Sequence, residues 1–179
     1  QVRTTNLDGD RQADLTVHGG PEKAVYLYPS EHYPFWRGEY PDIQMNWGHF
    51  GENLTTEGLN AEAAFIGDRF RIGSAEFMVT QPRLPCYKLA ARFERDDILR
   101  RFLRSGRTGL YFSVESEGEI QTGDTIELLG RDESKLTVSD ITNLYVSKEK
   151  NPELLARAVR HPALPVSWRD YFEEVLTRE

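Results

Sequence analysis

The segment RFRIGSAEFMV, residues 69–79, decides how this sequence is expected to fold. Its apolar residues alternate with polar ones on both sides of the Gly73-Ser74 pair: Phe70, Ile72, Phe77 and Val79. A period of two is typical of a strand that buries one face. A glycine-containing pair between two such runs is typical of a hairpin turn. The segment therefore predicts a β-hairpin with one face in a core.

Further strand signals lie on both sides of this hairpin. The runs at 24–28, 110–114 and 125–129 are rich in branched and aromatic residues. Gly-Asp pairs at 67–68 and 123–124 stand before two of the predicted strands and are typical of turns. Much of the chain is therefore expected to be β-structure.

Helices are expected to interrupt this β-structure. Ser30 is a plausible helix cap before an aromatic stretch. A second helix is predicted from Asp96-Asp97, with an apolar stripe that includes Ile98 and Phe102, and Gly106 follows its end. We expect residues 1–136 to form a mainly β body that contains these helices.

The last part of the chain changes character. Asn151-Pro152-Glu153 combines a cap, a first-position proline and a first-turn acid, and Ser167 is expected to cap another helix. A weaker helix is predicted over 137–146. Residues 137–179 therefore form a predicted three-helix unit. Its six basic and seven acidic residues argue against a DNA-binding role.

Composition narrows the possible functions. The chain has 179 residues and a net charge of −7, which gives no general support for binding nucleic acid. No stretch approaches the ~18 apolar residues of a membrane span, and no signal peptide is visible. The single cysteine, Cys86, excludes an intrachain disulfide or an iron–sulfur cluster held by this chain's own thiolates. We expect a soluble protein of a reducing compartment.

Cys86 is the first candidate for chemistry. It lies in TQPRLPCYK (80–88), where two prolines stiffen a segment expected to be a loop. Arg83 and Lys88 are near in sequence, and cations favour the thiolate, the form that attacks substrates or binds metals. A buried cysteine that acts only as a small apolar residue is the alternative.

Two glycine-containing segments are further candidates. In HGGPEK (18–23), paired glycines let backbone N–H groups approach an anion, and Lys23 adds charge. In GHFGENL (48–54), Glu52 and Asn53 are polar residues that could line a pocket. For each segment a simple turn is the alternative. The four histidines show no close ligand spacing that predicts zinc, and a Cys–His–Asp hydrolase stays open as a further alternative.

Charge is unevenly distributed along the chain. Residues 83–107 contain eight Lys and Arg against three Asp and Glu, a local charge of +5, so the remainder carries −12. The segment is either a solvated helix face or a site for an anion or acidic partner beside Cys86.

Four segments together resemble a known family. VHGGPEKAVYLYPSEHYPFW (17–36), GHFGENLTTEGL (48–59), IGDRFRIGSAEFMVTQPRLPCYKL (66–89) and SGRTGLYFSVESEGEIQTGD (105–124) are similar to the MOSC domain of the bacterial 6-hydroxylaminopurine-resistance type. The tail resembles the three-helix (3-alpha) domain that follows it. The resemblance implies an α+β fold: a MOSC-type β-barrel over 1–136 and the three-helix domain over 137–179. The family normally has further β-structure before residue 1, so we expect a chain that is either truncated or partly disordered at its N-terminus.

The resemblance also implies a site. Cys86 corresponds to the family's cysteine, a thiolate ligand of molybdenum or a sulfur carrier. The remaining cofactor-binding positions that it implies are His18, Gly19, Gly20, Lys23, Asn53, Arg83, Lys88, Arg107 and Tyr111. The implied cofactor is the molybdenum cofactor (molybdopterin), and pyridoxal phosphate binding is left open.

The activity implied is an oxidoreductase that reduces N-hydroxylated purines, pyrimidines or related hydroxylamines to amines in the cytoplasm. No cluster, flavin or nicotinamide motif is visible in the chain, so we expect a separate flavodoxin-like or ferredoxin-like electron donor. Two alternatives remain: a non-catalytic module that carries sulfur as a Cys86 persulfide or binds the cofactor, and a small-molecule-binding barrel in which Cys86 is structural.

Overall fold

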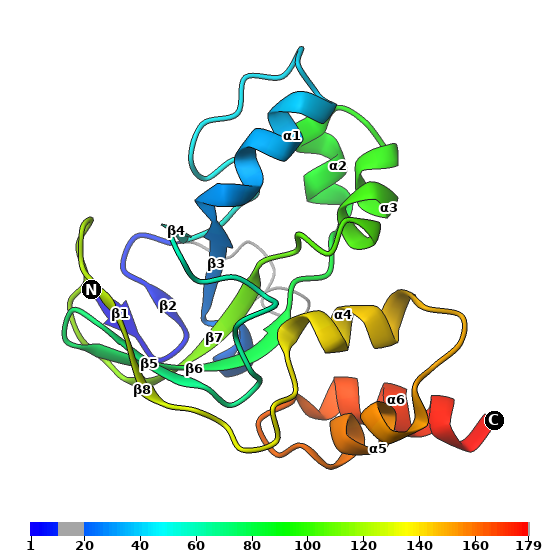
Figure 1. The fold of residues 1–179 in the computed structure, drawn as a ribbon. Coiled ribbons are helices and arrows are strands. Elements are labelled where there is room, and N and C mark those ends of the chain that lie inside the picture. The colour runs from blue at the N-terminus through cyan, green and yellow to red at the C-terminus, as the bar shows by residue number, and fades with distance from the viewer. Residues whose placement is uncertain (11–19, 179) are drawn as a thin grey trace.

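A computed structural model of the chain describes residues 1–10 and 20–178 (Figure 1). Its centre is a six-stranded sheet in the order β4-β3-β7-β6-β5-β8. The strands are β3 (Val25–Pro29), β4 (Leu54–Thr56), β5 (Arg69–Ile72), β6 (Ala75–Pro82), β7 (Leu110–Ser116) and β8 (Ile126–Gly130). Only the β3–β4 pair is parallel. Within the described ranges, the sheet stays open at β4 and β8 and is a mixed half-barrel.

The predicted hairpin is confirmed. β5 and β6 pair antiparallel with Phe70 opposite Phe77 and Ile72 opposite Ala75. The turn requires Gly73, whose φ is +56°, because a Cβ there would lie 2.2 Å from the carbonyl oxygen of Glu119. The strands predicted at 24–28, 110–114 and 125–129 are present as β3, β7 and β8, within two residues of the expected bounds. A short ribbon of β1 (Val2–Arg3) and β2 (Asn6–Leu7) precedes them.

Three helices gather beyond one end of the sheet, at the top of Figure 1. α1 (Tyr33–Glu39) lies in the β3–β4 connection, while α2 (Tyr87–Phe93) and α3 (Asp97–Arg104) lie between β6 and β7. α3 begins where Asp96-Asp97 predicted. The cap assigned to Ser30 is wrong, because a 3-10 turn over Ser30–His32 precedes α1 and the Ser30 hydroxyl bonds Glu31 instead of a helical N–H.

The last three helices are α4 (Val138–Val146), α5 (Pro152–Arg160) and α6 (Val166–Arg178). Asn151 caps α5 as expected by accepting from the Leu154 N–H at 3.0 Å. The cap assigned to Ser167 is wrong: this residue lies inside α6, since the carbonyl of Pro165 already accepts from the N–H groups of Trp168 and Arg169.

The buried side chains form two separate cores. We call the first the sheet core; it spans β3 and β5–β7 and continues into α4–α6, with members such as Leu27, Phe77, Ile141 and Phe172. The second, the aromatic core, lies among α1–α3 and is built mainly from Tyr26, Tyr28, Tyr33, Trp36, Tyr40, Phe50, Phe93 and Phe102. β3 separates the two, because alternate side chains of a strand point to opposite faces.

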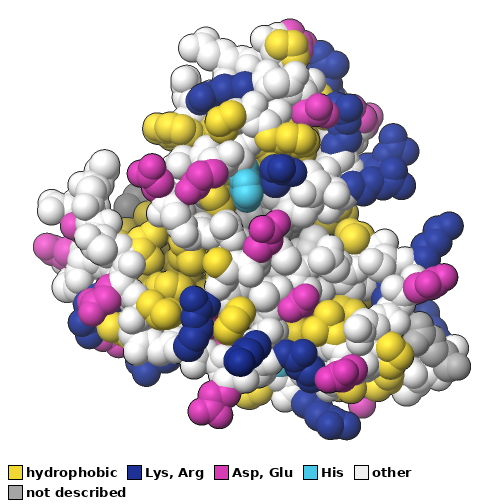
Figure 2. Space-filling view, viewed as in Figure 1, with side chains coloured by type: hydrophobic (Ala, Val, Ile, Leu, Met, Phe, Trp, Pro, Cys, Tyr) yellow, Lys and Arg dark blue, Asp and Glu magenta, His cyan; other side chains and the backbone are white. Residues whose placement is uncertain are grey.

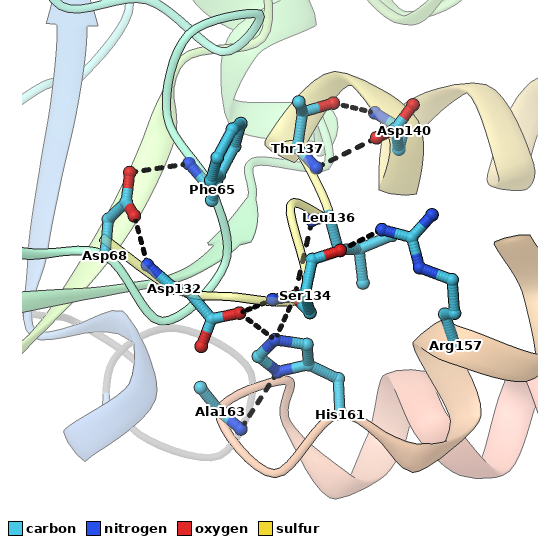
Figure 3. A network of polar contacts seen from close by, with 10 residues as sticks. All are labelled: Phe65, Asp68, Asp132, Ser134, Leu136, Thr137, Asp140, Arg157, His161 and Ala163. Carbon is cyan, nitrogen blue, oxygen red and sulfur yellow. Dashed lines mark hydrogen bonds and ion pairs between the residues drawn. The ribbon is translucent and has the colours of Figure 1, made fainter.

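Polar contacts also join the C-terminal helices to the sheet body (Figure 3). Asp68 is fully buried and accepts from the backbone N–H groups of Phe65 and Asp132 at 2.9 Å. The carbonyl oxygen of Ser134 accepts a hydrogen bond from the guanidinium of Arg157 in α5. The three helices therefore pack on the body through both apolar and polar contacts.

Candidate functional site

Three adjacent strands converge on the segment that carries Cys86. Tyr111 of β7 stands opposite Tyr26 of β3 on one side and opposite Gln81 of β6 on the other. β6 then ends at Pro82, so Arg83 and Cys86 leave the sheet beside these residues. The centre of the sheet thereby fixes the start of the segment.

Cys86 occupies the N-cap position of α2, with extended backbone angles. Its carbonyl oxygen accepts from the Leu89 N–H at 2.9 Å. The expectation that Cys86 lies in a loop is confirmed, because residues 83–86 connect β6 to α2 and the seven-residue helix begins only at the next residue. Its side chain is partly exposed, so the thiol is accessible to a ligand.

Arg83 is a buried cation beside Cys86. Its side chain is 9% exposed, and its guanidinium donates to the carbonyl oxygen of Phe50 and lies 3.4 Å from the Tyr26 hydroxyl. The guanidinium carbon also sits 4.8 Å from the centre of the Tyr26 ring. Within residues 1–10 and 20–178, no carboxylate forms an ion pair with it. A buried guanidinium held by neutral groups favours an anionic ligand.

Two tyrosines complete this environment. The rings of Tyr26 and Tyr111 are 5.1 Å apart between centres. Burial raises the pKa of both phenols, so both hydroxyls stay protonated at neutral pH. Cys86 interacts electrostatically with Tyr111 and with Arg83, which places the thiol, the phenol and the guanidinium in one group. Tyr26 and Phe50 were not identified from the sequence, although Tyr26 lies in a predicted strand.

The glycine-containing turn lies against the same strands. Gly20 has a φ of +89°, and a 3-10 turn over Pro21–Lys23 follows it. The Glu22 carbonyl accepts from the Thr80 hydroxyl at 2.7 Å and from the Gln81 side-chain amide at 3.1 Å. β6 therefore anchors the turn that carries Lys23. His18 and Gly19 lie outside the described residues.

Asn53 is engaged by the protein itself. Its side-chain oxygen accepts from the Tyr26 N–H at 2.8 Å, and its amide nitrogen donates to Asp10 at 2.8 Å. Its own N–H donates to the Tyr26 carbonyl, also at 2.8 Å. Asn53 thus holds the end of the GEN segment to β3. A direct role toward a cofactor stays a prediction.

Glu52 turns inward instead of lining a pocket. Its carboxylate, 9% exposed, accepts from the backbone N–H groups of Gly48 at 3.0 Å and Phe50 at 3.1 Å and from the Tyr33 and Thr55 hydroxyls. This arrangement fixes the loop that presents the Phe50 carbonyl to Arg83.

The remaining predicted site residues lie at different places. Lys88 is exposed on the first turn of α2, two residues after Cys86. Arg107 packs over the ring of Phe35 with its guanidinium carbon 4.1 Å from the ring centre, and its carbonyl accepts from the Tyr28 hydroxyl at 3.1 Å. Arg107 therefore contacts the α1 region, and its assignment to the pocket stays a prediction.

A set of Ser, His and Asp residues at the junction with α5 is structural (Figure 3). Nε2 of His161 faces both Ser134 Oγ at 2.9 Å and Asp132 Oδ1 at 3.2 Å, while Nδ1 accepts from the Ala163 N–H. A hydrolytic triad requires the serine and the acid on opposite ring nitrogens. The set therefore does not form such a triad.

The described residues contain neither a metal-binding cluster nor a membrane-spanning helix. No group of three or more His, Cys, Asp or Glu side chains there is placed to hold a metal ion. None of the helices in residues 1–10 and 20–178 has the length and apolar character needed to cross a membrane. A metal in the Cys86 group would thus need ligands other than such a cluster.

Comparison with protein families gives two matches. Residues 14–127 match the MOSC domain, and residues 136–178 match the YiiM-like, 3-alpha helix domain. The Bacillus subtilis (strain 168) protein YflK is 43% identical over 167 residues, which are 93% of this chain and 75% of that protein. A Gibberella moniliformis protein named "Reductase" is 38% identical over 162 residues, which cover 88% of this chain but only 28% of the fungal protein.

A solved structure has the same fold. The crystal structure of YiiM from Geobacillus stearothermophilus matches with a TM-score of 0.83 and 36% sequence identity. The match covers 88% of this chain and 80% of that one. The likeness extends over the sheet body and the C-terminal helices.

Proposed function

The chain belongs to the MOSC domain family, and from that premise we propose that it is a molybdenum-cofactor-dependent reductase of N-hydroxylated compounds. The observation that carries the proposal is the group formed by Cys86, the buried Arg83 and Tyr111. The similarity to a protein named as a reductase supports the reaction class. N-hydroxylated purines and pyrimidines are the proposed substrates.

The residues of this group suit the cofactor. A thiolate is a soft ligand of the kind that a molybdenum centre accepts, and the partly exposed Cys86 supplies one. A cofactor that brings its own pterin sulfur ligands needs few from the protein, which is consistent with the lack of a multi-residue metal cluster in the described ranges. Arg83 and Lys23 supply cations for the anionic pterin phosphate, together with backbone N–H groups near Gly20.

When bound, the cofactor supplies the two electrons that convert R–NHOH and two protons into R–NH₂ and water. Cys86 would hold it from the start of α2, and Arg83 would orient it, because the guanidinium is fixed by Tyr26 and the Phe50 carbonyl. Burial raises the pKa of the Tyr111 phenol, so this side chain keeps its proton and can donate a hydrogen bond near Cys86.

The first experiment measures molybdenum and pterin in the full chain purified from a molybdenum-replete host. Metal together with pterin supports the reductase. A persulfide on Cys86 without metal would support the sulfur carrier instead, and absence of all three would support a binding barrel with a structural cysteine.

The second experiment replaces Cys86 by Ser. A serine hydroxyl is rarely deprotonated and is harder than a thiolate, so reduction of an N-hydroxylated purine should be abolished. The free energy of unfolding should fall by no more than about 1–2 kcal/mol, since little volume is lost. A Cys86→Ser protein that keeps wild-type activity and its molybdenum would contradict the proposal.

We also propose that the basic surface of α3 receives an acidic electron-donor protein. Arg100 and Arg104 are exposed, and basic side chains gather at the edge of the molecule where α3 lies (Figure 2). Arg101 is less suitable for a charge-reversal test, because it already pairs with Glu39 at 3.1 Å. Electron transfer between proteins commonly depends on such exposed charges and weakens as salt rises.

The test is the double variant Arg100→Glu/Arg104→Glu. Turnover driven by a flavodoxin or ferredoxin should slow at low salt, whereas turnover with a small chemical reductant should be unchanged. Equal loss with both donors would refute docking on α3.

A further inference from the structure

A buried hydrogen-bonded chain links α6 to the turn that carries Lys23. The indole N–H of Trp168 donates to the side-chain oxygen of Gln81 at 2.8 Å. The side-chain amide of Gln81 donates in turn to the carbonyl of Glu22 at 3.1 Å. Trp168 is 6% exposed and Gln81 is 2% exposed, so the bond between them is buried, while the bond to Glu22 is partly buried.

The chemistry of the partners fixes which group donates and which accepts in each of these two hydrogen bonds. An indole N–H can only donate, and a backbone carbonyl can only accept. Gln81 must therefore direct its oxygen to Trp168 and its amide nitrogen to Glu22. A side chain with an acceptor alone or a donor alone at its end cannot make both bonds.

The connection ends at the backbone of the turn between Gly20 and Lys23. Glu22 lies between Gly20, with a φ of +89°, and Lys23, whose N–H donates to the Gly20 carbonyl at 3.0 Å. The Thr80 hydroxyl donates to the same Glu22 carbonyl at 2.7 Å. Of the side chains that hold this carbonyl, Gln81 is the one joined to the three-helix unit.

We propose that Trp168 and Gln81 are positioning residues through which the three-helix unit holds the Gly20–Lys23 turn in its ligand-binding conformation. The part that concerns cofactor retention rests on the proposed function. The part that concerns the turn does not, because it follows from contacts within the chain. Trp168 and Gln81 touch no reacting atom and act through the turn.

Hydrogen exchange of the Lys23 amide tests the connection directly in the full chain. Trp168→Phe keeps an aromatic ring but removes the donor, so local opening of the turn should raise Lys23 exchange about tenfold, equivalent to about 1.4 kcal/mol. Trp36→Phe is the matched control. It removes another buried indole donor, bonded to the Tyr28 hydroxyl at 2.6 Å, in the aromatic core.

A second variant distinguishes local opening of the turn from a loss of global stability. Trp168→Phe/Gln81→Met replaces both bonding partners by apolar side chains of similar shape, a change that can leave stability nearly unaltered. Lys23 exchange should still be about tenfold faster than in the wild type. Equal Lys23 exchange in the wild type and in both variants would overturn the proposal.

Molybdenum and pterin content, measured on the same samples, tests the link to the cofactor. Content should fall severalfold in Trp168→Phe relative to the wild type. Faster Lys23 exchange with undiminished content would refute the role toward the cofactor. If the wild type itself carries neither molybdenum nor pterin, the proposed function fails, while the exchange measurement still decides whether α6 holds the turn.

Discussion

The sheet core and the aromatic core lie on opposite faces of β3 but differ in chemistry. The sheet core is mainly aliphatic, and α4–α6 extend it. The aromatic core contains buried polar groups among its rings, notably Glu52, His49 and Arg83. Buried polar groups require specific partners, whereas apolar packing is non-directional. We infer that the sheet core mainly supplies stability, apart from the proposed Trp168–Gln81 connection, and that the aromatic core mainly supplies the geometry around Arg83.

The largest expected effect tests the sheet core. Phe77 is fully buried, and its ring centre lies 5.3 Å from that of Phe112. Phe77→Ala should lower the free energy of unfolding by about 3–5 kcal/mol, because it removes apolar contacts and leaves a cavity. Urea denaturation measures this loss. Molybdenum content per folded molecule should be unchanged. A parallel fall in content would contradict the inference that the sheet core mainly supplies stability.

A smaller loss of stability, with a larger effect on the site, is expected in the aromatic core. In Glu52→Gln an amide group replaces one of the oxygens that accept from Gly48, Phe50 and the Tyr33 hydroxyl. The free energy of unfolding should fall by about 1–3 kcal/mol, the range for an unsatisfied buried group. Molybdenum content should also fall, since the Phe50 carbonyl that holds Arg83 is displaced.

The matched control is Glu57→Gln. Glu57 is exposed and lies a few residues later in the chain, so the same change there should alter neither stability nor content. Identical behaviour of the two variants would show that the Glu52 carboxylate does not organise the loop.

The smallest effect is a pH dependence. Burial, together with the nearby Arg107 charge, lowers the pKa of His32 from 6.5 to about 4. The unfolded chain therefore binds more protons between pH 6.5 and 4, and stability falls as pH falls through this window. The loss should be up to about 2 kcal/mol, since the ring is partly exposed. Denaturation midpoints of the wild type and His32→Asn at both pH values measure it; equal slopes would contradict this assignment.

The sheet could be predicted because its signals are local. The alternation around Gly73 and the Gly-Asp pairs are patterns of neighbouring residues. The strands that they predict are present in the structure. α2 gave no such signal. Its N-cap is Cys86 instead of a Ser, Thr, Asp or Asn, and it ends at Glu94, which adopts a left-handed φ of +52° where glycine is usual.

The site could be predicted only in part. The family resemblance identified Cys86, Arg83 and Tyr111, which the structure brings together. Neither Phe50, which bonds Arg83 through its backbone carbonyl, nor Trp168, which bonds a residue 87 positions earlier, leaves a pattern in the sequence. Contacts of these kinds depend on the finished fold.

The aromatic core also has a consequence for the order of folding. Apart from Tyr26 and Tyr28 of β3, its members come from two connections of the chain, one between β3 and β4 and one between β6 and β7. Neither connection can bury its rings until the central strands have paired and brought the two connections together. The entropy cost of closing these loops therefore comes before the stabilisation from packing the rings. We therefore expect the aromatic core to condense after the rate-limiting step. A substitution such as Phe93→Leu should leave the refolding rate nearly unchanged and accelerate unfolding in stopped-flow measurements.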